Sequence, residues 1–299
     1  MNSTFAIETS DLRKHYGAVE ALRGLSLAVP SGSICGFLGR NGAGKTTTIK
    51  VLLGMARPTS GTAQVFGVPA GGADAAVDVR RRIGFVSDDK DLFDYMTVAE
   101  TIRFTAAFFP RWRADLEARY LRSFELPADR KVKALSRGMR TKLSLLLALC
   151  RGADLLILDE PTSGLDPAMT EEVLQALVGH VANEEMTVFF SSHQIAEVDQ
   201  IADHVAIVDR GRIVVSGALD DVRERYCRVE LVFEGEAPEV TFQTPGIERI
   251  RRKGRVLTVL SSAGAERLTA EARALNPVSV ETVPVTLKDI FLETVVGEN

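Results

Sequence analysis

A glycine-rich stretch near the N-terminus carries the residue types needed to bind phosphate. It matches the pattern G-x-x-x-x-G-K-[ST], in which glycines leave backbone N–H groups free to surround phosphate oxygens. Lys45 supplies the charge expected at the β- and γ-phosphates, and the Thr46 hydroxyl is an expected ligand of Mg²⁺. The residues expected to contact a nucleotide here are Gly39, Arg40, Asn41, Gly42, Ala43, Gly44, Lys45, Thr46 and Thr47.

Two carboxylates follow an apolar run later in the chain. Residues 155–158 are all apolar and predict a central parallel strand, at whose carboxyl end ligands usually bind. Asp159 is therefore expected to hold Mg²⁺ through water, and Glu160 to polarise the attacking water as a general base. A strand that ends in a solvated acidic turn is the alternative, and it is less favoured when a phosphate-binding loop is present.

Two further side chains are candidates for contact with the nucleotide. His193 follows the expected strand 187–190, so it is a candidate γ-phosphate contact, although an isolated histidine is more often structural. Tyr16 lies upstream of the glycine-rich loop, where an aromatic ring can stack on a nucleobase. Packing of Tyr16 against a strand edge explains that residue equally well from the sequence alone.

Alternating apolar and amphipathic segments predict the elements that hold these residues. The glycine-rich loop lies between an expected strand at 34–38 and an expected helix at 46–55, which is the strand–loop–helix context that the motif requires. The pattern as a whole predicts an α/β fold. Further strands are expected at 3–9, 25–29, 62–66, 83–86, 155–158, 187–190, 204–209 and 212–215, and further helices at 78–82, 168–182 and 194–202.

Residues 92–126 are expected to form two helices, the first with a capping box made by Thr97 and Glu100. Another helix is expected to start after Ser136, which is a suitable N-cap, and to run through Leu149. The aromatic residues of this segment can form a small helical core, a docking surface for a partner helix, or both. They are Phe93, Tyr95, Phe104, Phe108, Phe109, Trp112 and Phe124.

The last part of the chain predicts a small α+β domain without a catalytic group. Strands are expected at 227–233, 239–243, 247–252, 255–260 and 278–285, and helices at 264–275 and 287–296.

The composition restricts the class of partner and the compartment. The net charge is −4, which argues against nucleic acid because surfaces that neutralise phosphates are usually basic. Three separated cysteines, Cys35, Cys150 and Cys227, fit a reducing compartment and are expected in the core. The N-terminus lacks the pattern of a signal peptide, and no stretch reaches the roughly 18 apolar residues of a membrane span. Any membrane role therefore requires a partner.

Over roughly residues 4–220, the order of these motifs resembles the nucleotide-binding subunit of ATP-binding-cassette (ABC) transporters. Residues 39–46 look like the Walker A motif of that family, 155–160 like Walker B with its catalytic glutamate, 163–166 like the D-loop, and 135–139 like the signature segment. His193 falls at the position of the switch histidine, and Tyr16 at that of the aromatic residue that stacks on adenine.

The resemblance implies a P-loop NTPase core, with a mixed sheet and flanking helices, a helical insert and a β-subdomain. Residues 1–220 would form the ATPase domain, with the insert at about 92–150, and residues 221–299 a small C-terminal α+β accessory domain. ATP and Mg²⁺ are the implied cofactors. The C-terminal stretch, which ends with residues 287–293, resembles the tail of exporter subunits that have a separately encoded permease.

The implied mechanism is a head-to-tail dimer, of identical or different chains, with two ATP molecules at its interface. Lys45, Glu160 and His193 of one chain would act on an ATP that Ser136 and Gly138 of the other chain contact. A separately encoded multi-span permease would hold the subunit at the cytoplasmic face of the cell membrane. The alternative is an ABC-type ATPase that regulates a membrane complex or a ribosome without moving a solute.

Three residues depart from the family pattern, two in the signature segment and one at the Q-loop position. Arg137 replaces the first glycine of the signature, where it would add a positive charge near phosphate or point to solvent, and Met139 replaces the signature's glutamine. Asp88 stands where the family has the Q-loop glutamine, and its carboxylate retains an oxygen for Mg²⁺ or water. Because Lys45 and both carboxylates at 159–160 remain, ATPase activity is expected, although a sensor that binds ATP and hydrolyses it poorly is a further possibility.

Overall fold

A computed structural model defines the fold. Across the residues that the model describes, the chain forms two compact units, Met1–Ile213 and Val214–Asn299. Each unit has its own cluster of buried apolar side chains. The described residues are 4–70, 75–89, 92–184, 186–262 and 265–295.

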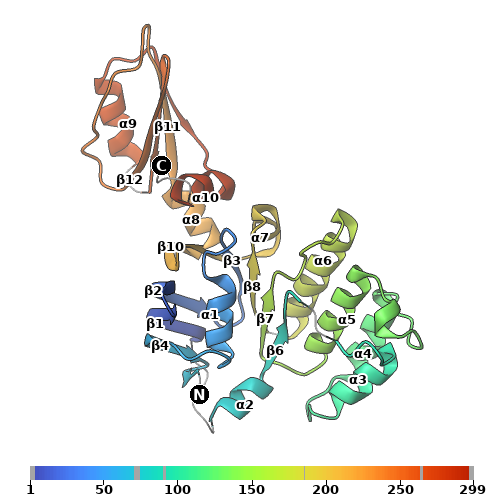
Figure 1. The fold of residues 1–299 in the computed structure, drawn as a ribbon. Helices are drawn as coiled ribbons and strands as arrows, with labels where there is room; N and C mark the ends of the chain where they lie inside the picture. The colour runs from blue at the N-terminus through green and yellow to red at the C-terminus, as the bar shows by residue number, and fades with distance from the viewer. Residues whose placement is uncertain (1–3, 71–74, 90–91, 185, 263–264, 296–299) are drawn as a thin grey trace. The chain divides into compact units, whose positions relative to one another are not determined.

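A six-stranded sheet forms the centre of the first unit (Figure 1). The sheet order is β10 (Arg212–Ala218), β9 (His204–Asp209), β3 (Ile34–Leu38), β8 (Thr187–Ser192), β7 (Leu155–Asp159) and β6 (Ile83–Val86), and the division between the units falls inside β10. Strand β3 is parallel to β8 and β9, and β7 is parallel to β6 and β8. Strand β8 therefore lies between β3 and β7, so that the three strands end at the same edge.

Both faces of this sheet are covered by other elements. As a result, β3, β7 and β8 are buried along their whole length. Cys35 and Phe37 of β3 face the same core as Ile49 of α1, whereas Gly36 faces Val198 of α7. This alternation is the period of two that a strand imposes on its side chains. The helices that pack on the sheet include α1 (Lys45–Leu52), α2 (Ala75–Arg81), α5 (Arg137–Leu149), α6 (Pro167–Glu184) and α7 (Ile195–Ile201).

An antiparallel sheet forms the rest of the first unit's β structure. Its order is β2 (Val19–Pro30), β1 (Phe5–Tyr16), β4 (Ser60–Val65) and β5 (Val68–Pro69). β1 and β2 are longer than the expected strands at 3–9 and 25–29, because the ladder continues through register shifts beside Asp11 and Gly24, which have positive φ angles of 44° and 93°. Bulges of this kind interrupt the alternating pattern on which the sequence expectation depended.

The helical insert contains α3 (Val98–Ala106), α4 (Ala114–Ser123), the short 3₁₀ helix η1 (Val132–Ala134) and α5 (Arg137–Leu149). The predicted capping box at the start of α3 is confirmed, because Thr97 and Glu100 exchange hydrogen bonds. The aromatic residues divide between a core and a surface. Tyr120 and Phe124 are buried, whereas Phe93, Tyr95, Phe104 and Phe108 are exposed and in ring-to-ring contact.

The second unit pairs an antiparallel sheet with short helices. The prediction of a strand at 239–243 is wrong, because this segment packs Phe242 into the core without joining the sheet and the Gln243 amide donates to the Glu271 carboxylate. The sheet order is β12 (Ile247–Lys253), β13 (Val256–Ser261), β11 (Cys227–Val232) and β14 (Ser279–Val283), and the helices are α8 (Leu219–Arg225), α9 (Ala265–Ala274) and α10 (Leu287–Val295).

The cysteines Cys35, Cys150 and Cys227 are buried and free, as predicted, and burial raises the pKa of the Cys150 thiol to about 12. None of the helices within the described ranges has the length and apolar character needed to cross a bilayer.

The packing of β3 against α7 leaves no room for a side chain at Gly36. A Cβ atom at Gly36 would overlap both methyl groups of Val198. We expect Gly36→Ala to lower the free energy of unfolding by about 1–3 kcal/mol, as overpacking does, and added Val198→Ala to recover part of that loss. Urea unfolding measures both, and Gly179→Ala is the matched control because a Cβ there meets open space. Equal stability of Gly36→Ala and wild type would contradict this packing.

Candidate functional site

A cleft of about 590 Å³ lies where β3, β7 and β8 end. Among its lining residues are Glu160, Ser163 and His193, which follow β7 and β8, and Asp88, which follows β6. Most of the glycine-rich loop also lines the cleft, namely Arg40, Asn41, Gly42, Gly44, Lys45, Thr46 and Thr47. The structure thus brings the loop, both strand ends and Asp88 together around one space.

The loop has the backbone shape that its glycines predict. Gly42 and Gly44 have φ angles of 82° and 111°, which L side chains rarely adopt, and α1 begins directly after Gly44. Gly39 has no room for a side chain, since a Cβ there would contact the Val208 carbonyl oxygen at 2.6 Å. The Ala43 carbonyl accepts a hydrogen bond from Gly211. Backbone N–H groups at the start of a helix favour a bound anion such as phosphate.

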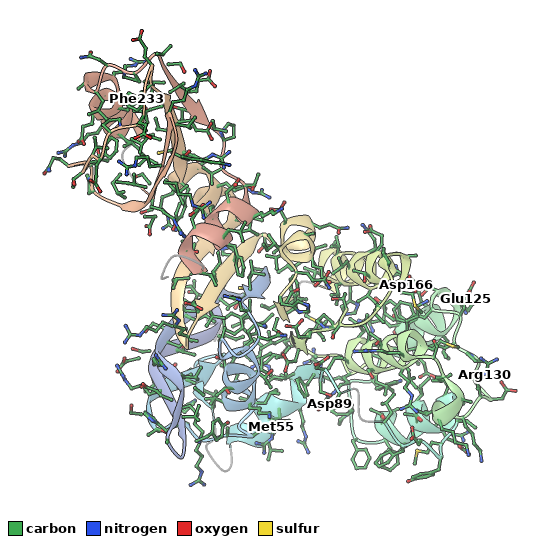
Figure 2. The ribbon with its side chains drawn as sticks, turned by 45° about the horizontal axis from the view of Figure 1, so that its top comes forward. Met55, Asp89, Glu125, Arg130, Asp166 and Phe233 are labelled. Atoms are coloured by element: carbon green, nitrogen blue, oxygen red, sulfur yellow. The ribbon has the colours of Figure 1, made fainter. Side chains whose placement is uncertain are left out.

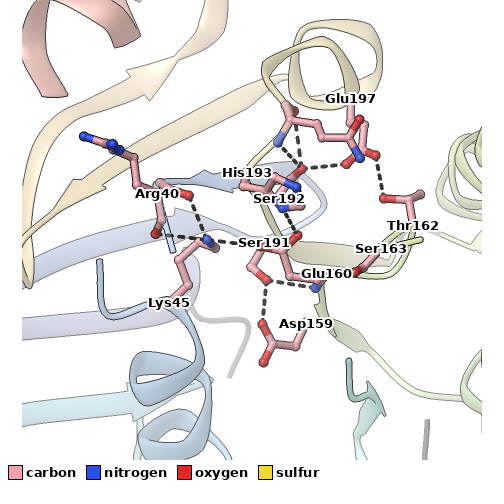
Figure 3. Close-up of polar contacts among 12 residues, drawn as sticks. Arg40, Lys45, Asp159, Glu160, Thr162, Ser163, Ser191, Ser192, His193 and Glu197 are labelled. Atoms are coloured by element: carbon pink, nitrogen blue, oxygen red, sulfur yellow. Dashed lines mark hydrogen bonds and ion pairs between the residues drawn. The ribbon is translucent and has the colours of Figure 1, made fainter. Parts of the chain in front are cut away.

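Lys45, Glu160 and His193 form a continuous chain of contacts along this cleft (Figure 3). The Lys45 ammonium donates to the carbonyl oxygens of Gly39 and Arg40 at 2.7 and 3.3 Å and lies 3.1 Å from Glu160 Oε1. The other oxygen of Glu160 is 2.6 Å from His193 Nδ1. Glu160 adopts a φ angle of 50°, an uncommon backbone conformation for a residue with a side chain. Such a strained residue is often found where a side chain must point into a functional site.

Ser191 is a positioning residue that the sequence reasoning missed. Its hydroxyl donates to Asp159 Oδ1 at 2.7 Å and accepts from the Glu160 backbone N–H at 3.0 Å, so a single side chain orients both acidic positions (Figure 3). Asp159 is only 4% exposed, so little water is available to replace this hydrogen bond. The sequence signal that could have identified Ser191 is the pair of serines, Ser191 and Ser192, at the end of an apolar strand.

A second hydroxyl network was also missed by the sequence reasoning. Ser192 and Thr162 both donate to the Glu197 carboxylate, each at 2.6 Å, although all three side chains are buried. The network joins the end of β8 to the segment after β7 and to α7. It therefore fixes the spacing between the strand that precedes His193 and the segment that carries Glu160.

The donor set fits a Mg²⁺ ion that is held by few protein oxygens. Asp88 and Thr46 line the cleft and also an adjoining groove, which Asp159 lines as well. Among the described residues, no cluster of three or more His, Cys, Asp and Glu could form an all-protein metal site. Mg²⁺ commonly retains waters and binds one or two carboxylates together with substrate phosphates, which is the type of donor set found here.

Tyr16 lies at the end of β1. It is paired in register with Val19, which lines the cleft. Tyr16 is 47% exposed, and the Lys14 ammonium lies 4.8 Å from the centre of its ring. Tyr16 itself is not among the residues that line the cleft. Its exposed ring is of the kind that can stack on a planar base.

Ser136 and Gly138 lie at the start of α5 and do not line the cleft of their own chain. Ser136 accepts a hydrogen bond from the Met139 amide and caps the helix, as predicted. The exposed Arg137 side chain lies over Gly164, with Nη2 3.5 Å from the Ser163 hydroxyl. Arg137 thus contacts the D-loop segment of its own chain.

Comparisons with known proteins agree with this geometry. The family model described as "ABC transporter" matches residues 22–163. The bacitracin transport ATP-binding protein BcrA of Bacillus licheniformis is 31% identical, with 97% of each chain covered. The Nod factor export ATP-binding protein I of Ralstonia nicotianae is 32% identical, with 98% of this chain and 94% of that protein covered.

Solved structures add an independent comparison. A structure described as the ATP binding subunit of an ABC transporter superposes with a TM-score of 0.66 at 29% identity, over 73% of this chain and 92% of that one. The sequence similarity to BcrA and to the Nod factor protein extends over almost the whole of each chain. The chain therefore belongs to the ATP-binding subunits of ABC transporters and is an ATPase of that family.

Proposed function

We propose that this ATPase drives export through a separately encoded membrane permease. The observation that supports ATP hydrolysis as the energy source is the series of contacts from Lys45 through Glu160 to His193 beside the glycine-rich loop. These contacts join a cation that can bind phosphate to a candidate base and to the group that orients this base. The direction of transport is supported by a relative named for Nod factor export. The resemblance of the C-terminal tail to that of exporter subunits agrees with this direction.

In this proposal the loop residues 39–47 bind the phosphates of ATP and Tyr16 stacks on its base. Thr46, Asp159 and Asp88 would hold Mg²⁺, which supplies neutralisation of phosphate charge when it is bound. Lys45 then donates to the β- and γ-phosphates. Since those phosphates compete with Glu160 for the Lys45 ammonium, ATP would loosen the 3.1 Å ion pair between the two side chains.

Glu160 is the proposed general base and His193 its orienting partner. A carboxylate released from Lys45 can accept a proton from water aimed at the γ-phosphate, while His193 holds the other carboxylate oxygen. Phosphoryl transfer needs mainly positioning and neutralisation of charge, which these groups supply.

We further propose a head-to-tail dimer, in which Ser136 and Gly138 of one chain contact the ATP of the other. Ser136 is exposed at the start of a helix of 13 residues and lines no part of its own cleft. Both properties fit a residue that acts on a partner's nucleotide. Arg137, packed on the D-loop of its own chain, would then link the two sites of such a dimer.

The proposed partner is a multi-span permease that holds the subunit at the cytoplasmic face of the cell membrane. The exposed aromatic residues of the helical insert are a candidate contact surface, since exposed apolar patches usually mark interaction sites. Residues 1–220, with the insert at 92–150, would form the ATPase domain, and residues 221–299 an accessory domain. Nucleic acid is not a proposed partner, given the net charge of −4.

The role of Glu160 is tested by Glu160→Gln. We expect the variant to bind ATP and to accumulate as a dimer, while phosphate release falls by about 100-fold or more because the general base is lost. Size-exclusion chromatography with ATP and a phosphate-release assay measure the two effects. Glu224→Gln, on the exposed part of α8, is the control. Turnover of Glu160→Gln at the wild-type rate would rule out a catalytic role for this carboxylate.

Removal of the Ser191 hydroxyl tests its positioning role. We expect Ser191→Ala to lower kcat by about tenfold and to weaken the apparent Mg²⁺ affinity by a similar factor, as the loss of an orienting hydrogen bond does at metal sites. Mg²⁺ titration of ATP hydrolysis measures both, with the exposed Ser123→Ala as control. A Mg²⁺ titration identical to that of wild type would show that Ser191 does not position Asp159.

Dependence on Mg²⁺ provides a test that does not rely on the general base. We expect EDTA to abolish hydrolysis and excess Mg²⁺ to restore it, and Asp88→Asn to need about tenfold more Mg²⁺ for half-maximal activity. Calorimetric titration of Mg²⁺ into the ATP-bound Asp88→Asn chain separates binding from turnover. Full activity in EDTA would contradict the metal assignment, and an unchanged Mg²⁺ requirement would remove Asp88 from it.

A further inference from the structure

The helical insert differs in charge from the rest of the chain. Residues 92–150 contain 11 Lys and Arg but only 6 Asp and Glu, which is a net charge of +5. The whole chain contains 36 and 40 of these residues, so 25 and 34 lie outside the insert, with a net charge of −9. The insert is therefore basic although the chain as a whole is acidic.

Most acidic side chains of the insert already have partners within it, whereas several of its cations do not. Arg130, Lys131 and Lys133 are exposed, and none of them is in an ion pair among the residues that the structure describes. Glu125 and Asp129 are exposed as well. The engaged carboxylates are Asp94 with Arg140, Glu100 in the capping box, Asp115 with Arg113, and Glu117 with the Trp112 indole N–H.

A buried valine holds the basic segment, residues 130–133, against the insert. Val132 is 0% exposed, while its two lysine neighbours are exposed. The backbone N–H groups of Val132 and Lys133 donate to the carbonyl oxygens of Met96 and Asp94. Arg130 lies at the outer edge of the insert in Figure 2. The backbone of the segment is thus fixed while its charged side chains stay at the surface.

Exposed aromatic rings lie beside the basic segment. Lys131 forms a β-bridge with Thr97, and Tyr95, in the same stretch 94–97, is 67% exposed. The Tyr95 ring contacts that of Phe93, with centroids 5.8 Å apart. Tyrosine rings and cations are both favoured at the headgroup level of a membrane. Because these rings belong to the proposed contact surface for the permease, the basic segment beside them would face the bilayer around that permease.

We propose that residues 130–133 contact the anionic headgroups of a lipid bilayer. The inference rests on the proposed function, since it places the subunit at the membrane, but it adds an attachment to lipid that does not pass through the permease. The acidic remainder of the chain does not prevent this contact. A planar surface can touch the insert alone, and charges farther from it than the Debye length, about 8 Å at physiological salt, are largely screened.

The expected strength follows from the number of cations. Each Lys or Arg close to an anionic surface contributes about 1 kcal/mol, which is roughly a fivefold change in the partition coefficient. The three cations of the basic segment should together strengthen binding by about 100-fold.

The test measures co-sedimentation of the full chain with vesicles. One set contains phosphatidylcholine and phosphatidylglycerol in equal parts, and the other contains phosphatidylcholine alone. We expect the wild type to bind the mixed vesicles at least about tenfold more tightly than the neutral ones, and added salt to release it. The combined variant Arg130→Gln, Lys131→Gln, Lys133→Gln should bind the mixed vesicles about 100-fold more weakly than the wild type.

A second triple variant is the matched control. Arg252→Gln, Lys253→Gln, Arg255→Gln removes the same charge from exposed positions of the second unit, where none of the three is in an ion pair among the described residues. We expect its binding to change by less than about threefold. ATP hydrolysis near the wild-type rate shows that each variant is folded. If a triple variant does not fold, the three single replacements in the basic segment are used, each with an expected loss of about fivefold.

Three vesicle results would overturn the lipid contact. The first is equal binding of the wild type to mixed and neutral vesicles, and the second is an equal loss of binding in both triple variants. The third is binding to a single-stranded RNA oligomer but not to the mixed vesicles, which would assign the basic segment to nucleic acid.

The permease is tested separately, by co-purification in detergent with the multi-span protein encoded in the neighbouring reading frame. The variant of residues 130–133 should still co-purify, because no bilayer is present. Its loss from the complex would assign the segment to the permease and overturn the lipid contact. Failure of the wild type to co-purify would instead overturn the proposed function, while the vesicle measurements would still decide the contact with lipid.

Discussion

The site depends on keeping the Lys45 ammonium charged although it is almost fully buried. A buried cation is costly unless acceptors replace the water that it loses. Two carbonyl oxygens of the loop and the Glu160 carboxylate are those acceptors. The loop must therefore curve around the ammonium, and the strand before Glu160 must end within reach of it, which is a constraint on the whole central sheet.

The order of the strands meets that constraint. Because β8 lies between β3 and β7, its last residues separate the phosphate-binding loop from the acidic pair by one strand. Ser191 fills that position with a hydroxyl that bonds to both Asp159 and Glu160. His193 follows two residues later and contacts the Glu160 carboxylate oxygen that is not paired with Lys45. The residues of the candidate site are thus connected through the strand between them.

The departures from the family pattern have structural consequences of different kinds. Arg137 remains exposed but packs on Gly164 of the D-loop segment in its own chain. Asp88 lies at the boundary of the cleft and the adjoining groove, so a carboxylate borders both spaces where the family pattern has a glutamine.

The sequence by itself determined the α/β class, the glycine-rich loop with its lysine, the acidic pair, the capping box at Thr97 and the Ser136 cap, because each depends on local spacing. Only the tertiary structure revealed the contacts of Ser191, the Glu197 network and the position of Arg137. Those features depend on which strands and helices become neighbours, and residues far apart in the chain give no local signal of that. The strand expected at 239–243 failed for the same reason, since the Glu271 carboxylate takes an amide that a sheet would have used.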